Sequence, residues 1–346
     1  MSSDRSSLLT RAAVTTGATL TGAYVGTTAA RWWHRRSLPP PDALPPVLDW
    51  ASRSLETPHG RSHCYVRPGT GPPIVLLHSL NAVASSHEMV PIAEHLAATT
   101  DRPLYAVDWL GFGRSDRPAL DYTPQVYGDQ LYQVLSDLLD APADLVALSL
   151  GCEYAAWMGL QAAPLVRRLA LISPTGLTAA RGPSLAGRLA LALAAPTGLF
   201  ELFYYRLTRP ASLRDYYERQ VFLDAEHVSD VLVDAAATTA QAKGASYAPQ
   251  RFVQGRLYVP DAASSLYERL YRPTLFLTPS RPGPTVQSFD LLSPVLDRNP
   301  RSLTHRTLPG GLMPHWEASA ALFDVLTPFL SSPEQRAGAG RTAPGA

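Results

Sequence analysis

Of all residues in the chain, Ser149 has the sequence surroundings most typical of a catalytic residue. It stands between an apolar run at residues 145–148 and a helical segment. The small residues Ala147 and Gly151 permit a tight, strained turn that lifts the hydroxyl above the start of the helix. The free N–H groups of that helix start face the same space, and the N–H of Leu150 is placed to bind a developing oxyanion. This pattern predicts a nucleophilic serine, with a simple helix cap as the alternative.

The elements that must position this serine alternate along the chain. Short apolar runs predict strands at residues 74–78, 104–108, 145–148, 166–172, 274–278 and 304–308. Segments of helical length separate most of these runs, and Ser85 and Glu88 have the spacing of a capping box at the start of one helix. The alternation predicts an α/β fold with a doubly wound, mostly parallel sheet.

Between residues 177 and 271 the alternation stops. This stretch is rich in Ala, Leu and Tyr and has no strong strand pattern. We predict an inserted helical lid here, with helices over residues 185–194, 199–207 and 228–242. The lid divides the α/β domain into a first part at residues 47–176 and a second part at residues 272–330.

The two ends of the chain differ from this domain. Residues 12–33 hold a long uncharged stretch followed by two tryptophans, and we interpret them as a membrane anchor. A cleaved signal peptide and a disordered or loosely helical tail are the alternatives, which correspond to a secreted or a cytoplasmic protein. Residues 1–46 thus form an anchor-like segment with a Pro-rich linker, and residues 331–346 are expected to be disordered.

The composition excludes several classes of protein. The net charge is +1, 46% of the residues are hydrophobic, and no block of like charge is present, so no nucleic-acid partner is expected. The two cysteines and nine scattered histidines form no metal-binding motif. We therefore expect no metal and no cofactor.

Residues 60–330 resemble the α/β-hydrolase superfamily through several motifs in chain order. Residues 147–151 resemble its nucleophile elbow, with Ala147 where glycine is usual. Residues 77–81 resemble the loop after the third strand of the fold. The resemblance implies that Leu80 in this loop gives the second oxyanion N–H.

Two further motifs complete the likeness. Residues 108–115 are similar to the D-x-x-G-x-G-x-S loop after the fourth strand, and residues 311–317 occupy the slot of the catalytic histidine. Because a serine hydroxyl needs a base near neutral pH, the resemblance implies that His315 activates Ser149. A surface or turn histidine is the alternative for His315.

The third catalytic group is not evident. In the superfamily the carboxylate usually follows the strand at residues 274–278, but Pro282 stands at that place. Asp290 is the first acid downstream and our candidate, with a helix cap as its alternative. No acid follows the strand that ends at Ile172, and Glu153 in the elbow helix is a further candidate.

The resemblance implies a serine hydrolase that cleaves an ester or related acyl bond of an apolar small molecule through an acyl-enzyme. The apolar lid and the lack of an arginine cluster indicate an uncharged substrate. A serine nucleophile argues against haloalkane dehalogenase and epoxide hydrolase chemistry, which use an aspartate. The missing acid keeps a catalytically weak or inactive binding protein open, and an acyltransferase is a further alternative.

Overall fold

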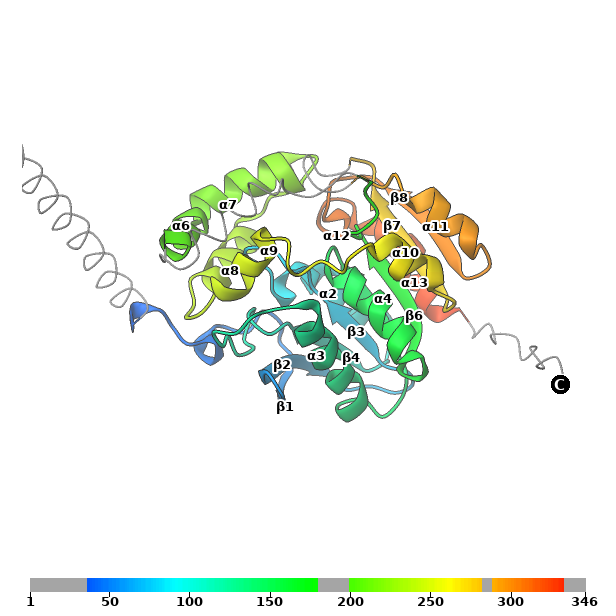
Figure 1. Cartoon of the computed structure of the whole chain (residues 1–346), viewed down its shortest axis with the longest axis horizontal. Helices are drawn as coiled ribbons and strands as arrows, with labels where there is room; N and C mark the ends of the chain where they lie inside the picture. The colour runs from blue at the N-terminus through cyan, green and yellow to red at the C-terminus, as the bar shows by residue number, and fades with distance from the viewer. Residues whose placement is uncertain (1–35, 180–198, 282–287, 333–346) are drawn as a thin grey trace, which may run out of the picture.

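The computed structural model describes residues 36–179, 199–281 and 288–332, and an eight-stranded sheet runs through them in the order β1-β2-β4-β3-β5-β6-β7-β8 (Figure 1). The strands are β1 (Ala51–Thr57), β2 (Gly60–Arg67), β3 (Ile74–Leu77), β4 (Leu104–Asp108), β5 (Ala143–Leu148), β6 (Val166–Ile172), β7 (Thr274–Pro279) and β8 (Leu303–Leu308). From β4 to β8 along this order neighbours pair in parallel, whereas β1 and β2 form an antiparallel hairpin at one edge. The predicted α/β fold with a mostly parallel sheet is confirmed.

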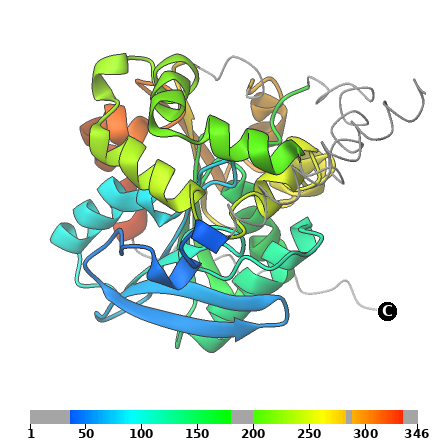
Figure 2. The ribbon, with the colours of Figure 1, turned by 90° about the vertical axis from the view of Figure 1, so that its left-hand side faces the viewer.

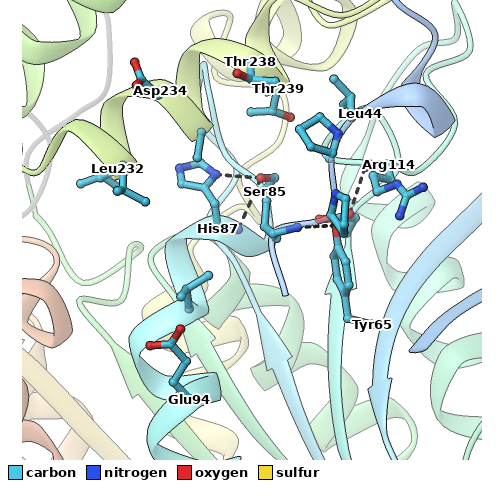
Figure 3. Close-up of a pocket in the computed structure, with 18 of the residues that line it drawn as sticks. Leu44, Tyr65, Ser85, His87, Glu94, Arg114, Leu232, Asp234, Thr238 and Thr239 are labelled. Atoms are coloured by element: carbon cyan, nitrogen blue, oxygen red, sulfur yellow. Dashed lines mark hydrogen bonds between the residues drawn. The ribbon is translucent and has the colours of Figure 1, made fainter. Parts of the chain in front are cut away.

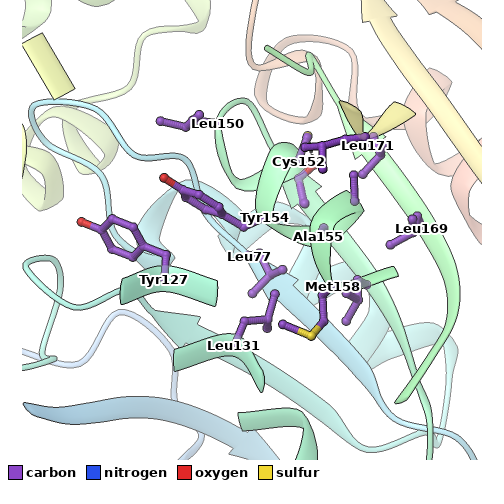
Figure 4. Close-up of a cluster of buried hydrophobic side chains, with 14 of the residues drawn as sticks. Leu77, Tyr127, Leu131, Leu150, Cys152, Tyr154, Ala155, Met158, Leu169 and Leu171 are labelled. Atoms are coloured by element: carbon purple, nitrogen blue, oxygen red, sulfur yellow. Dashed lines mark hydrogen bonds between the residues drawn. The ribbon is translucent and has the colours of Figure 1, made fainter. Parts of the chain in front are cut away.

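Each face of the sheet has its own apolar core, because neighbouring residues of a strand point to opposite faces. In β3, Val75 and Leu77 belong to one cluster, and Ile74 and Leu76 belong to the other. The first cluster includes side chains of α3 (Pro124–Asp137), α4 (Gly151–Gln161), α10 (Ala262–Ser265) and α11 (Leu292–Arg298). The second includes side chains of α2 (Val90–Thr99) and α13 (Ser319–Ser331). Figure 4 shows part of the first cluster, in which Leu77 and Leu169 lie near the elbow helix residue Met158.

All six predicted strands are present, and the sequence pattern missed β1 and β2. The missed β1 has the sequence Ala-Ser-Arg-Ser-Leu-Glu-Thr, and most of its side chains are exposed. An edge strand with two solvated faces has little apolar alternation, so its sequence resembles a loop. The hairpin turns at Gly60, which has φ 134.

The segment between β6 and β7, here called the insertion, consists of helices joined by turns and loops where the structure describes it. It contains α6 (Leu199–Leu207), α7 (Pro210–Tyr216), a π-helix (Tyr217–Val221), α8 (Asp230–Ala240), α9 (Tyr247–Val253) and α10. In Figure 2 most of these green and yellow helices lie above the sheet, on the side opposite the blue hairpin. Tyr204 in α6 donates a hydrogen bond of 2.8 Å to the carbonyl of Ala82, in the loop after β3.

Some predicted elements lie outside the described residues. The helix expected at residues 185–194 and the anchor expected at residues 12–33 are among them, as is most of the tail from residue 331. Within residues 36–179, 199–281 and 288–332, no helix has the length and apolar character needed to cross a membrane.

Two glycines with positive φ, Gly113 in the loop after β4 and Gly71 in the loop before β3, differ in how closely other atoms pack around them. A Cβ on Gly113 (φ +50) would lie 2.1 Å from Cγ of Asp108, whereas a Cβ on Gly71 (φ +88) would meet nothing within 4 Å. We expect Gly71→Ala to lower the free energy of unfolding by about 1 kcal/mol through backbone strain alone. Gly113→Ala adds a clash with a buried carboxylate and should cost about 3 kcal/mol or more. Urea unfolding of both variants measures the difference, and equal losses would contradict the packing.

Candidate active site

Ser149 lies in a strained turn between β5 and α4. Its φ is 53, in the left-handed region that residues with a Cβ rarely adopt. The turn is held from both sides, because the Ser149 N–H donates to the Ile172 carbonyl at 2.9 Å and its carbonyl accepts the Cys152 N–H at 3.0 Å. A Cβ on Gly151 would lie 2.7 Å from the carbonyl oxygen of His78. Glycine there therefore lets the turn approach the loop after β3, as the small-residue pattern predicted.

The loop after β3 is anchored by His78, which is fully buried. The backbone N–H of Trp109 donates to His78 Nε2 at 3.1 Å, and the indole N–H donates to the His78 carbonyl at 2.9 Å. Because Nε2 accepts a hydrogen bond, the ring proton is on Nδ1, which lies 2.5 Å from the Ser79 carbonyl oxygen. Burial lowers the pKa of His78 to about 4, so the ring is neutral near pH 7.

Glu88 secures the same loop from the other side. Its Oε2 accepts the Ser79 N–H at 2.8 Å, and its Oε1 accepts the Ser79 hydroxyl and the Asn81 amide, each at 2.9 Å. The predicted capping box is therefore wrong in its second half: Ser85 caps the short 3-10 helix η2 (Ser86–Met89), but Glu88 turns toward the loop. Burial raises the pKa of Glu88 to about 7, against the effect of these hydrogen bonds.

The two predicted oxyanion donors lie beside these anchors. Leu80 follows Ser79 in the loop after β3, and Leu150 follows Ser149 at the start of α4. The Ser79 N–H is already used by Glu88. Among the hydrogen bonds between described residues, none uses the N–H of Leu80 or of Leu150.

His315 lies in the short helix α12 (Pro314–Glu317), which follows β8, and it is fully buried. Its Nε2 is 2.7 Å from the backbone carbonyl oxygen of Glu88, which also accepts the indole N–H of Trp316 at 3.0 Å. A carbonyl only accepts hydrogen bonds, so Nε2 carries the ring proton and the free lone pair is on Nδ1. Nδ1 has no hydrogen-bond partner in the described part of the chain. Burial lowers the pKa of His315 to about 4, which keeps the ring neutral near pH 7.

Within the described part of the chain, His315 is hydrogen-bonded to the Glu88 carbonyl and not to Ser149 or to a carboxylate. Asp290 is exposed, and its carboxylate accepts a hydrogen bond from the Ser288 hydroxyl. The helix cap offered as its alternative is also absent, because α11 begins at Leu292 with Leu291 at the cap position. Asp290 is therefore not hydrogen-bonded to His315 in this structure.

Glu153, the further acid candidate, is turned toward the insertion. The Thr175 hydroxyl donates to its Oε1 at 2.5 Å, and the Val259 N–H donates to its Oε2 at 2.7 Å. The carboxylate is fully buried, and burial raises its pKa to about 7. Glu153 therefore joins the elbow helix to the insertion.

The sequence pattern did not predict that the Glu88 carboxylate binds the loop after β3. Its spacing from Ser85 indicated a cap, and nothing local signals a carboxylate that bonds nine residues back to Ser79. The described residues hold no group of three or more His, Cys, Asp or Glu side chains that could bind a metal ion. Cys64 and Cys152 are buried free thiols that form no disulfide.

These features define a protein of the alpha/beta hydrolase fold. The sequence pattern of that family matches residues 72–269, so the chain belongs to the family. An uncharacterized protein of Mycobacterium tuberculosis (strain ATCC 25618 / H37Rv) is 33% identical over 137 residues. That match spans 39% of this chain and 39% of the relative.

Solved structures share the fold. The enol-lactonase from Burkholderia xenovorans LB400 superposes with a TM-score of 0.64 at 17% identity, covering 81% of this chain and 100% of that one. The carboxylesterase CesB (YbfK) from Bacillus subtilis also gives 0.64, at 19% identity, covering 82% of this chain and 92% of that one. At these identities the likeness is one of fold.

Glu153 predicts a pH-dependent stability. Its pKa is raised from 4.5 to about 7, so between these values the folded state keeps a proton that the unfolded state has lost. The resulting contribution to the free energy of unfolding is fully present below pH 4.5 and is lost as the pH rises through about 7. Glu153→Gln keeps an acceptor for Val259 and a donor for Thr175 but removes this titration. The stability of the variant relative to wild type should rise by about 1 to 3 kcal/mol from pH 5 to pH 8.

Urea unfolding at both pH values measures this difference. The variant must be compared with wild type at each pH, because the buried His78 and His315 have the opposite effect. Their lowered pKa values increase the free energy of unfolding of both proteins as the pH rises from about 4. Glu94→Gln, at an exposed position of α2, is the matched control for loss of a carboxylate. A Glu153→Gln difference that is the same at both pH values would contradict the buried, protonated carboxyl group.

Proposed function

We propose that this protein is a serine hydrolase that cleaves an ester or related acyl bond of an apolar small molecule, through an acyl-enzyme on Ser149. The observation that carries the proposal is the left-handed backbone of Ser149 between β5 and α4, with φ 53. A serine that only caps a helix has an extended backbone, so capping does not explain this conformation. A strained turn that presents a hydroxyl at the carboxyl end of a central strand is the arrangement of a nucleophile elbow.

His315 is the base in this mechanism, and it acts through Nδ1. The hydrogen bond from Nε2 to the Glu88 carbonyl fixes the tautomer and leaves the lone pair on Nδ1. As Ser149 Oγ attacks the substrate carbonyl carbon, its proton passes to Nδ1. The Glu88 carbonyl takes the orienting part that a carboxylate has in a triad, so the pair works as a dyad.

The N–H groups of Leu80 and Leu150 stabilise the negative charge that develops on the substrate oxygen. The Glu88 carboxylate holds Ser79, the neighbour of Leu80, by two hydrogen bonds. When the tetrahedral intermediate collapses, the proton on His315 goes to the leaving alcohol and the acyl group stays on Ser149. A water molecule then gives a proton to the same ring and attacks the acyl carbon. The bond from that carbon to Ser149 Oγ breaks, the ring returns its proton to Oγ, and the carboxylic acid leaves.

The class of substrate is supported by the fold relatives and by the insertion. The names enol-lactonase and carboxylesterase both denote enzymes that cleave a bond between an acyl carbon and an oxygen. Apolar side chains of the insertion also share a core cluster with the sheet. The insertion packs on the loop after β3 through Tyr204, and we infer that it is the lid over Ser149.

A catalytically weak or inactive binding protein is the second candidate, and one observation favours it. No described carboxylate bonds to His315, and its Nδ1 is buried without a partner. Loss of the acid lowers turnover by about 10⁴ in serine proteases, and only the oxyanion hole and substrate binding then remain. A backbone carbonyl is a dipole rather than a charge, so we expect slow turnover.

Covalent labelling by a fluorophosphonate decides between the two candidates. We expect the full-length protein to be labelled at one site, because the probe needs an activated serine in an oxyanion hole. Ser149→Ala should abolish labelling and hydrolysis of p-nitrophenyl butyrate. Ser173→Ala is the matched control, since Ser173 also has a left-handed backbone, with φ 47, at the end of the neighbouring strand β6. Well-folded protein that is not labelled, or labelling that depends on Ser173, would rule out the proposal.

If Ser149 and His315 act as a dyad, the candidate acid Asp290 should contribute little to turnover. Because Asp290 is exposed and bonded to Ser288, Asp290→Asn should change kcat for p-nitrophenyl butyrate by less than about 3-fold. His315→Gln should lower it by about 10³-fold or more, to the level set by the oxyanion hole and binding. A loss of similar size in Asp290→Asn would show that Asp290 reaches His315 during catalysis.

A further inference from the structure

A cavity of about 400 Å³ lies beside the proposed catalytic residues without including them. Its walls come from residues 44–47, from η2 and α2, from the loop after β4 and from α8. Ser149, Leu150 and His315 do not line it, but Trp316, which follows His315 in the chain, is part of its wall. The volume is in the range of cavities that hold small organic ligands.

His87 gives this cavity an unused polar group. The side chain is 2% exposed and lines the cavity, and its Nδ1 lies 2.7 Å from the Ser85 hydroxyl oxygen. Its Nε2 is buried and has no hydrogen-bond partner among the described residues. Figure 3 shows the ring between Ser85 on one side and Leu232 and Asp234 of α8 on the other. A buried nitrogen without a partner is unfavourable, and a suitable ligand would supply the missing hydrogen bond.

The charge around His87 restricts what that ligand can be. Burial lowers the pKa of His87 to about 3, so the imidazole is neutral near pH 7. Glu94 and Asp234 are exposed at the cavity and disfavour an anion. The described lining holds one guanidinium, that of Arg114, which these two carboxylates outnumber; its hydrogen bonds to the Asp42 carbonyl at 3.0 Å and the Ser52 hydroxyl at 3.4 Å orient it without removing its charge.

The Asp108 carboxylate also lines the cavity but is used by the protein. One of its oxygens accepts the N–H and the hydroxyl of Ser86, and the other accepts the N–H of Arg114. Much of the remaining wall is aliphatic or aromatic and includes Leu44, Val47, Val90, Leu232 and Trp316. A largely apolar ligand with one hydrogen-bonding group for His87 fits this lining.

We propose that this cavity binds an uncharged, largely apolar alcohol, with its hydroxyl group on Nε2 of His87. The Ser85 hydroxyl can donate to Nδ1 or accept from it, so Nε2 presents a proton in one tautomer and a lone pair in the other. A hydroxyl group satisfies both tautomers. The hydrocarbon part lies against Leu232 and Trp316. This binding does not require Ser149 or any hydrolytic activity.

Calorimetric titration of the full-length protein with 1-octanol tests the proposal. We expect saturable binding at one site, and octanoate of the same chain length should bind at least 10-fold more weakly. Thr238→Trp places a large side chain into the cavity from an exposed position of α8 and should weaken octanol binding at least 10-fold. Ala98→Trp, at an exposed position of α2 away from the cavity, is the matched control and should bind as wild type does.

Two further variants separate this site from the catalytic one. His87→Phe removes the nitrogen and should lower octanol affinity about 10-fold, while Ser149→Ala should leave the affinity unchanged. Octanol should also change the tryptophan fluorescence of wild type and not that of Trp316→Phe. The proposal is overturned if wild type shows no saturable binding, if Thr238→Trp binds octanol as tightly as wild type, or if octanoate binds as tightly as octanol.

Discussion

The buried Glu88 is the interaction on which the site depends. Its carboxylate accepts three hydrogen bonds from Ser79 and Asn81, and its backbone carbonyl accepts the ring N–H of His315. One residue therefore joins the loop after β3 to the helix after β8, two segments separated by more than two hundred positions of sequence. A buried carboxylate is stable only when donors surround it, so the loop must keep the shape that supplies them.

Strain at Ser149 is the second constraint, and its neighbours hold it in place. The left-handed turn is fixed by hydrogen bonds to Ile172 and Cys152, and Gly151 lets it approach the His78 carbonyl. Such a conformation costs about 1–3 kcal/mol and persists only where surrounding structure imposes it. The apolar cluster beneath α4, with Leu77 and Leu171, provides that support.

Burial gives the site its electrostatic character. The rings of His78, His87 and His315 are all held neutral near pH 7, and the pKa values of Glu88 and Glu153 are raised to about 7. In surroundings of low polarity, hydrogen bonds and backbone dipoles act more strongly than they do in water. The same burial leaves Nδ1 of His315 and Nε2 of His87 without hydrogen-bond partners among the described residues.

The sequence by itself determined the alternating strands and helices, the parallel sheet and the place of Ser149 in a turn. These features depend on local properties: apolar runs mark strands buried on both faces, and small residues mark a turn with little room. The antiparallel β1 escaped this reasoning because most of its side chains are exposed. Only the tertiary structure decided that Glu88 turns to Ser79, that His315 bonds to the Glu88 carbonyl and that Asp290 bonds to Ser288. Hydrogen bonds between residues distant in sequence depend on how strands and loops pack, and this packing cannot be predicted from the spacing of residues along the chain.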